Sequence, residues 1–183
     1  MKLCLYWASV ETTEIGVFMR ILIADKLPPQ AIERLESGSF EVSNQPTLKG
    51  EVLAGAIEAF APQVLVVRST SVTASHLNAG GSLGLVVRGG AGVNTIDLES
   101  CSRLGICVAN CPGKNAIAVA ELTMGLALGL DRRIYDNVAD LRQAMWNKKT
   151  YSAGRGLHGR TLGLLGLGRI GMEVARMGRS LGM

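Results

Sequence analysis

The sequence is poor in aromatic residues and in side chains that bind metals. Phenylalanine, tryptophan and tyrosine together make up 4% of the 183 residues, and there are only two histidines. Four cysteines occur without a CxxC spacing, at Cys4, Cys101, Cys107 and Cys111. A zinc site is therefore not expected, and neither is another metal. Thiols without a pairing pattern are typical of a reducing compartment, so the cytoplasm is the expected location.

Strong charge of one sign and long apolar runs are missing as well. The net charge is +4, and the densest basic runs, Arg132-Arg133 and Lys148-Lys149, hold two positive charges each. Such pairs are typical of solvated helix faces, so no nucleic-acid partner is expected. The most apolar helical stretch, residues 116–130, contains Glu121 and is shorter than the ~20 residues of a membrane span. No membrane partner is expected either.

Glycine and aliphatic residues are abundant by contrast. There are 23 glycines, and 48% of the residues are hydrophobic, a balance that favours alternating strands, helices and tight turns over an all-β sandwich. Residues 3–10 are apolar, but the acidic ETTE follows where a signal peptide would need small residues for cleavage. Residues 1–18 are therefore expected to be an extension with no assigned fold.

From Met19 onward, short β-branched runs alternate with helical patterns, which is typical of βαβ units. The expected strands cover residues 20–25, 40–45, 63–67, 85–89 and 106–110. The expected helices cover residues 28–37, 50–60, 73–80 and 97–105, the last with Asp97 as N-cap and Gly105 as C-cap. The fold class predicted from this alternation is α/β, with a doubly wound parallel sheet.

The second half of the chain predicts a connector and the start of another α/β unit. One long helical stretch is expected over residues 116–146, with Gly125 and Gly129 allowing close packing or a bend. Residues 147–160 have no period and predict a loop, and the apolar run 161–166 predicts a strand. The expected domains are therefore 19–115, a connecting segment 116–160, and a truncated nucleotide-binding domain that begins at 161.

A GxGxxG motif at residues 166–171 stands between that expected strand and a helical pattern. In this context Gly166 permits the tight turn, Gly168 lets the backbone approach a pyrophosphate, and Gly171 lets the helix pack closely. A glycine-rich turn without a ligand is the less favoured alternative. The acidic residue that would select NAD over NADP is expected about 20 residues further on, so the choice between these cofactors stays open.

Polar residues follow three of the expected strands at their carboxyl ends, where open parallel sheets bind ligands. Arg68-Ser69-Thr70 could bind an anion, although a surface ion pair of Arg68, with Ser69 and Thr70 capping the next helix, is favoured on sequence alone. Residues 89–93 form a possible anion nest, and Asn115 follows the fifth strand, but each is more typical of a turn. His76 and His158 are expected at the surface, without a catalytic role.

Six blocks of the sequence, in order and spacing, closely resemble the D-isomer-specific 2-hydroxyacid dehydrogenases. They are ILIAD (21–25), VVRSTSVT (66–73), VVRGGAGVNTIDL (86–98), NCPGKNAIAVAELTMGLAL (110–128), LRQAMWNKK (141–149) and LHGRTLGLLGLGRIGMEVA (157–175). The resemblance implies a flavodoxin-like substrate domain, followed by a Rossmann domain that binds NAD, with NADP not excluded. It implies substrate contacts by Arg68, Ser69, Ala91, Gly92 and Asn115. It implies cofactor contacts by Gly166, Gly168, Arg169, Ile170 and Gly171.

The same resemblance implies hydride transfer to or from a D-2-hydroxy acid, with 3-phosphoglycerate and serine biosynthesis favoured, by a homo-oligomeric parent protein. The acid/base His, its partner Glu and the carboxylate-binding Arg of the family match no residue here. No catalytic residue is therefore assigned, and the chain is expected to be an inactive fragment. Asn94 departs from the Asp that is usual in the family. Two alternatives are a non-catalytic binding protein like the C-terminal-binding-protein corepressors, and an isolated flavodoxin-type binding domain.

Overall fold

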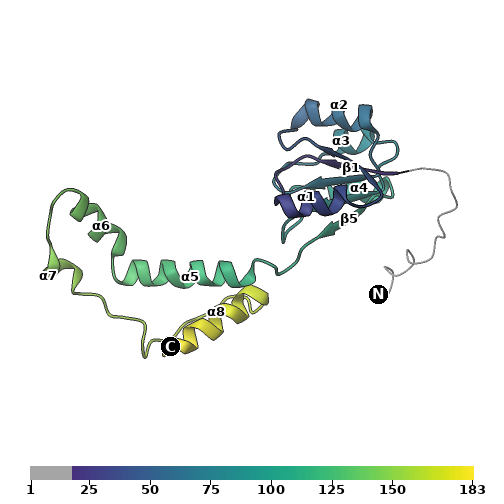
Figure 1. Ribbon diagram of the computed structural model, residues 1–183. Helices are drawn as coiled ribbons and strands as arrows, with labels where there is room; N and C mark the ends of the chain where they lie inside the picture. Colours follow the sequence, from purple (N-terminus) through teal and green to yellow (C-terminus); the bar gives the residue numbers. More distant parts are fainter. Residues whose placement is uncertain (1–17) are drawn as a thin grey trace. The chain divides into compact units, whose positions relative to one another are not determined.

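A computed structural model describes residues 18–183, and its central feature is a five-stranded parallel sheet (Figure 1). The strands are β1 (Met19–Ile23), β2 (Phe40–Asn44), β3 (Val64–Val67), β4 (Leu85–Arg88) and β5 (Cys107–Asn110). Their order across the sheet is β2-β1-β3-β4-β5, and every neighbouring pair is parallel. The α/β fold class is confirmed, and each expected strand lies within about two residues of the observed one. This strand order is the flavodoxin-like one.

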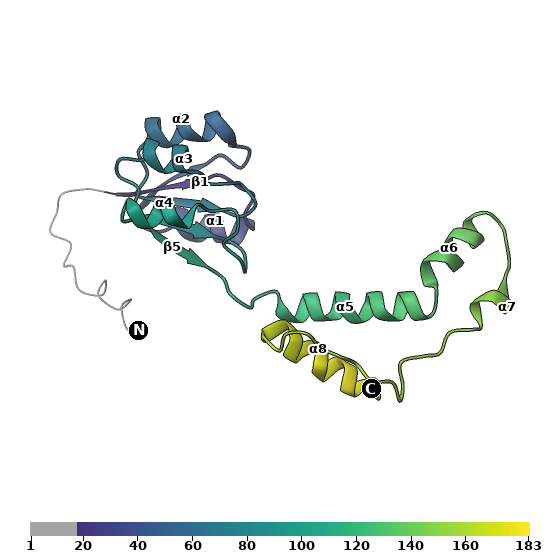
Figure 2. The ribbon, with the colours of Figure 1, turned by 180° about the vertical axis from the view of Figure 1, so that it is seen from behind.

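Helices cover both faces of the sheet, as the alternation of apolar residues along the strands requires. On one face lie α2 (Gly50–Phe60), α3 (Ala74–Ala79) and α4 (Leu98–Arg103), and on the other lies α1 (Pro29–Glu36) (Figures 1 and 2). Within β1, Leu22 packs in the cluster with α2 and α3, whereas Ile21 and Ile23 pack in the cluster with α1. Successive side chains of a strand point to opposite faces of the sheet, so the sheet has an apolar layer on each face.

The chain divides into two compact units. The first, which we call the sheet unit, comprises residues up to Gly89 together with Val93–Asn110. The second, the helical unit, comprises Gly90–Gly92 and Cys111–Met183. The extension expected at residues 1–18 lies outside the described residues except for residue 18, so that expectation stays a prediction.

The long helix expected over residues 116–146 is in fact two helices, α5 (Ala116–Asp131) and α6 (Ile134–Arg142). The chain turns at Arg133, whose φ of 51° is left-handed and interrupts the helix. Gly129 permits the bend, because a Cβ there would come within 2.9 Å of the ring of Tyr135. Nothing lies within 4 Å of a Cβ built at Gly125, so this glycine is not needed for packing within the described chain.

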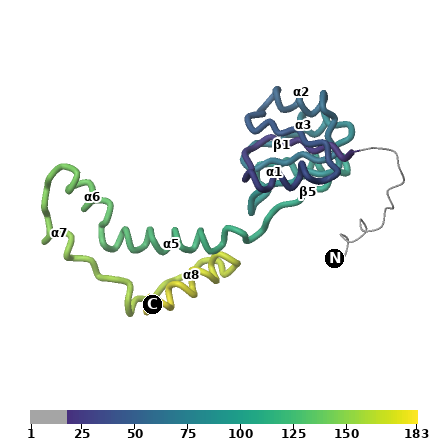
Figure 3. Tube along the Cα trace, viewed as in Figure 1, coloured from purple at the N-terminus to yellow at the C-terminus, as the bar shows by residue number. Residues whose placement is uncertain are grey.

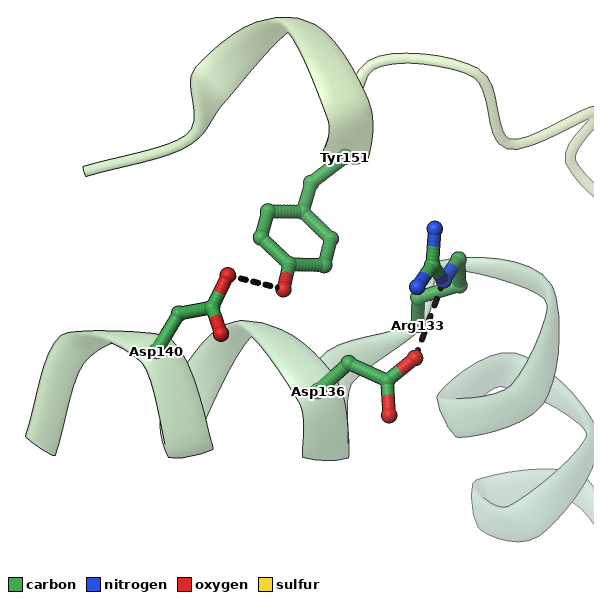
Figure 4. A network of polar contacts seen from close by, with 4 residues as sticks. All are labelled: Arg133, Asp136, Asp140 and Tyr151. Atoms are coloured by element: carbon green, nitrogen blue, oxygen red, sulfur yellow. Dashed lines mark hydrogen bonds and ion pairs between the residues drawn. The ribbon is translucent and has the colours of Figure 1, made fainter. Parts of the chain in front are cut away.

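The expected loop 147–160 contains one short helix, α7 (Lys148–Tyr151), held to α6 by polar contacts (Figure 4). The hydroxyl of Tyr151 donates a hydrogen bond of 2.5 Å to Asp140, which raises the pKa of this tyrosine. The guanidinium of Arg133 lies 5.3 Å from the centre of the Tyr151 ring and forms an ion pair with Asp136. These contacts join α7 to α6, although the segment has no apolar periodicity.

The segment 161–166 is not a strand, although the helix that follows it, α8 (Arg169–Ser180), is present. A β-strand needs a neighbour for its backbone hydrogen bonds, and no strand within residues 18–183 pairs with this segment. α8 lies beside α5 (Figure 3), where Val174 packs against Ala120, Met124 and Leu157. No helix of residues 18–183 is long and apolar enough to cross a membrane.

Candidate functional site

The strand order creates a switch point between β1 and β3, where the crossover connections leave the sheet in opposite directions. Open α/β sheets bind ligands at the carboxyl ends of the strands at such a point. Arg68 and Ser69 follow β3 at this position, and both are exposed. The topology therefore places the two residues that the sequence indicated at the edge where an open α/β sheet binds its ligand.

Asp25, which follows β1, holds the backbone of this loop and was not identified from the sequence. Its Oδ2 accepts the backbone N–H groups of Arg68, Ser69 and Thr70 at 2.7, 2.9 and 2.8 Å. Desolvation acts to raise the pKa of Asp25, but the backbone hydrogen bonds outweigh it, and the net pKa lies below the ordinary value. An acidic residue directly after a buried strand was the available sequence signal.

The guanidinium of Arg68 makes no ion pair within the described part of the sheet unit. Ser69 and Thr70 do not cap the next helix either, because Thr73 is the N-cap of α3. The alternative favoured on sequence alone, an ion-paired arginine followed by helix-capping hydroxyls, is therefore wrong for this loop. An exposed arginine that pairs with no carboxylate among residues 18–183 is available to bind an anionic ligand.

His76 is buried, with 5% of its surface exposed, which corrects the expectation of a surface position. Its Nδ1 accepts the backbone N–H of Thr73 at 3.0 Å, so its Nε2 carries the proton and donates to the carbonyl oxygen of Gly50 at 3.0 Å. His76 thus joins α3 to α2 and has a structural role. The Thr-x-x-His spacing resembles a capping box and could have indicated this. His158 is exposed, as expected.

Two of the three glycines of the GxGxxG motif meet a backbone constraint, and the third adjoins open space. Gly166 has a φ of +99°, which is strained for any other residue. A Cβ at Gly171 would lie 2.3 Å from the carbonyl oxygen of Gly166, so this glycine closes the loop on itself. At Gly168 nothing lies within 4 Å of such a Cβ. The loop therefore leaves open space at the one glycine where a pyrophosphate is expected to approach.

A cleft of about 490 Å³ within the helical unit brings several of the expected site residues together. Its lining includes Ala91, Asn115, Gly166, Gly168, Arg169, Ile170 and Gly171. Asn115 is the N-cap residue of α5, but its side chain makes no capping hydrogen bond and is exposed. Its amide is therefore available to a ligand. Three separate segments thus converge on the N-terminus of α8, whose unpaired N–H groups favour an anion.

Arg169 and Gly92 were also expected in the site, as cofactor-binding and substrate-binding residues. The guanidinium of Arg169 donates a hydrogen bond to the carbonyl oxygen of Pro112 and packs on Gly113, where a Cβ would lie 2.5 Å from the arginine side chain. The guanidinium of Arg169 is therefore engaged with the loop at residues 112–113. Gly92 is exposed and belongs to the helical unit with Ala91, whereas Arg68 and Ser69 belong to the sheet unit.

Comparisons with known proteins identify the family. Residues 21–175 match the model of the D-isomer specific 2-hydroxyacid dehydrogenase catalytic domain, and the chain belongs to this family. Several D-3-phosphoglycerate dehydrogenases are similar to it in sequence. The enzyme of Homo sapiens is 41% identical over 165 residues, which cover 90% of this chain and 30% of the relative. The chain thus spans about 30% of the length of these relatives.

Solved structures agree with the fold. The TT0316 protein from Thermus thermophilus is similar with a TM-score of 0.79 and 31% identity, covering 90% of this chain and 54% of that one. The NAD+-bound 3-phosphoglycerate dehydrogenase of Entamoeba histolytica is similar with a TM-score of 0.72 and 28% identity, covering 91% and 52%.

Proposed function

We propose that this chain supplies the substrate-anion loop and the cofactor pyrophosphate loop of a nicotinamide-dependent D-2-hydroxyacid dehydrogenase of the 3-phosphoglycerate type. The observation that carries the proposal is the cleft in which Ala91 and Asn115 meet the GxGxxG loop at the N-terminus of α8. The similarity to D-3-phosphoglycerate dehydrogenases supports 3-phosphoglycerate as the substrate, with a place in serine biosynthesis, and NAD as the cofactor.

The residues of the chain fit this chemistry. Arg68 binds a carboxylate or phosphate oxygen pair through its planar guanidinium, and Ser69 adds a hydroxyl hydrogen bond. Asn115 donates its amide N–H to the substrate, next to Ala91 and Gly92. The pyrophosphate lies against the N–H groups that open α8, close to Gly168. When bound, the nicotinamide exchanges a hydride with C2 of the hydroxy acid.

We further propose that the 183 residues alone bind ligands but do not transfer hydride. His76 is committed to two structural hydrogen bonds, so it cannot act as the acid/base of the reaction. His158 is exposed and makes no hydrogen bond or ion pair with any residue from 18 to 183. Neither residue therefore has the carboxylate partner that tunes an acid/base histidine. Steady NADH formation from 3-phosphoglycerate by the purified chain would contradict this proposal.

The binding proposal is tested with two variants and one matched control. Arg68→Ala removes a charge-assisted hydrogen bond and should raise the dissociation constant for 3-phosphoglycerate about 10- to 150-fold, with NADH binding unchanged. Gly168→Val should have the opposite pattern, because its side chain fills the space that the pyrophosphate needs. Arg34→Ala removes the same charge from the last turn of α1, away from the Arg68 loop, and should change neither affinity.

The outcomes separate the two ligands. Calorimetry measures 3-phosphoglycerate binding, and NADH fluorescence measures cofactor binding, each on all four proteins. If Arg68→Ala changed only cofactor affinity, or if Gly168→Val left NADH binding intact, the assignment of the two loops would be wrong. If the unaltered chain bound NADH but no hydroxy acid, a binding protein of the corepressor type would be the better description.

The parent protein is proposed to be a homo-oligomer. Large apolar side chains are exposed along α5 and α6 and after them, including Leu122 (62%), Leu130 (73%) and Trp146 (78%). Patches of this kind mark interaction surfaces in monomeric chains, and the family resemblance implies a second copy as the partner. Sedimentation of the chain, with Leu130→Glu as the variant that should dissociate the oligomer, tests this.

A cytoplasmic location is likewise a proposal. The cysteines of the described residues, Cys101, Cys107 and Cys111, are free thiols, and Cys107 and Cys111 are exposed. Exposed free thiols persist in reducing compartments. Fractionation of cells that express the protein would test this.

A further inference from the structure

The carboxylate of Asp25 fills an anion site made by the backbone of the Arg68 loop. Three successive N–H groups, those of residues 68, 69 and 70, converge on the single oxygen Oδ2 at 2.7 to 2.9 Å. Consecutive N–H groups that point into one concavity form a nest, which binds phosphates and carboxylates in many proteins. Here the anion in the nest belongs to the chain itself, so these three backbone donors are not left for a substrate.

The peptide of Arg68 is held from the other side as well. The Nε of Arg88, the last residue of β4, donates a hydrogen bond of 3.1 Å to the carbonyl oxygen of Arg68. The N–H of Gly89 donates to the carbonyl oxygen of Val67 at 2.8 Å. β1 and β4 flank β3 in the sheet. Asp25 after β1, and Arg88 and Gly89 at the end of β4, therefore fix the backbone at the end of β3 from both sides.

The fixed backbone leaves the charge of Arg68 available. A carboxylate and an arginine in the same loop cluster commonly form an ion pair, which would cancel the positive charge. Asp25 and Arg68 do not form one, because Oδ2 of Asp25 accepts the backbone N–H groups instead. Arg68 and Ser69 are exposed while their backbone N–H groups are bonded.

We propose that Asp25 is a positioning residue of the substrate site: its carboxylate occupies the backbone nest at residues 68–70, so that this loop binds the substrate anion through the side chains of Arg68 and Ser69 and not through its backbone. This inference rests on the proposed function for the role of Arg68. Asp25 does not touch the substrate. Asp25 lowers the entropic cost of substrate binding, because the loop is already fixed before the ligand binds.

The first test uses the ligand-free chain and nuclear magnetic resonance. Asp25→Ala should speed the hydrogen exchange of the amides of residues 68–70 by about tenfold or more, since three charge-assisted hydrogen bonds are lost. Asp25→Asn keeps an oxygen acceptor and should restore part of the protection. In the unaltered chain, the three amide signals should shift together as the pH falls below 3.8, the ordinary pKa of an aspartate.

Asp97→Ala is the matched control. Asp97 is another carboxylate of the sheet unit that accepts a backbone N–H, that of Ser100 at 3.0 Å, but it caps α4. Its removal should destabilise the unit without changing exchange at residues 68–70. Unchanged exchange in Asp25→Ala, or equal acceleration by Asp97→Ala, would overturn the inference.

The second test uses 3-phosphoglycerate as the probe. Asp25→Ala should weaken binding about tenfold or more, and Asp25→Asn less. The double variant with Arg68→Ala should bind only slightly more weakly than Arg68→Ala, because Asp25 acts mainly through the side chain of Arg68. NADH affinity should not change.

The results distinguish the positioning role of Asp25 from the proposed function of the chain. Weak binding by Arg68→Ala together with unaltered affinity in Asp25→Ala would overturn the inference and leave the proposed function intact. Unaltered affinity in Arg68→Ala would overturn the proposed function and, with it, the substrate role of Asp25. The amide exchange would then still show whether Asp25 orders the loop.

Discussion

Gly168 and Gly171 both have ordinary backbone angles, but replacing each by alanine should have opposite effects on the GxGxxG loop. Gly171→Ala places a Cβ 2.3 Å from the carbonyl oxygen of Gly166, where ordinary contacts begin at 3.4 Å, so backbone must move by about 1 Å. Gly168→Ala places a Cβ in open space, at φ −77° and ψ −165°, which is accessible to every residue. The first substitution should damage the loop, and the second should not.

The expected change in stability for Gly171→Ala is the difference between two opposing effects. Alanine in place of glycine near the start of a helix favours the helix by up to about 1 kcal/mol. Overpacking against a rigid neighbour costs about 1–3 kcal/mol, and the neighbour here is backbone rather than a flexible side chain. We expect a net loss of about 1–2 kcal/mol, confined to the loop and the first turn of α8. For Gly168→Ala we expect no loss of stability.

Hydrogen exchange of the α8 amides and NADH titration together read out both effects. Gly171→Ala should exchange faster in the first turn of α8. Gly168→Ala should keep native exchange and lose cofactor affinity, since its methyl group would occupy the space proposed for the pyrophosphate. Native exchange in Gly171→Ala would refute the contact argument. Full NADH affinity in Gly168→Ala would mean that the open space beside this glycine does not receive the cofactor.

Three other predictions concern polar side chains. The contribution of Asp25 to stability should be complete above pH 3.8 and lost as the pH falls through its lower folded-state pKa, so the difference in Tm between the chain and Asp25→Asn should vanish in acid. His76→Ala should lower the free energy of unfolding by about 3 kcal/mol in urea titration, since it leaves a cavity and two unpaired backbone groups. Asp140→Asn should lower the pKa of Tyr151, measured by tyrosinate absorbance, because the hydrogen bond and the charge of Asp140 now raise it.

Local patterns in the sequence were sufficient for the sheet. Each β-branched run between turn signals became a strand, and Asp97 caps α4 as its position predicted, with Gly105 at φ +70° just beyond the end of that helix. These features depend on residues close in sequence, which is why they can be predicted.

Features that depend on distant partners could not be predicted in the same way. The run 161–166 has the composition of a strand, but strand formation depends on a neighbouring strand, and none pairs with it within the described residues. The role of Asp25 depends on N–H groups more than 40 residues away, and that of His76 on a carbonyl group in α2. The expectation of a ligand-binding Arg68 came from the family resemblance rather than from local pattern.

The way in which Asp25 holds its loop also bears on how such a site can change during evolution. Three hydrogen bonds that Asp25 accepts come from backbone N–H groups, which every residue except proline possesses. The backbone of this loop is therefore held independently of the exposed side chains of Arg68 and Ser69, whereas the side chain of Thr70 is buried. If Arg68 and Ser69 bind the substrate as proposed, substitutions at these two positions can alter which acid is recognised without refolding the loop. A designer could then exchange these two side chains as long as Asp25, Thr70 and a non-proline backbone remain.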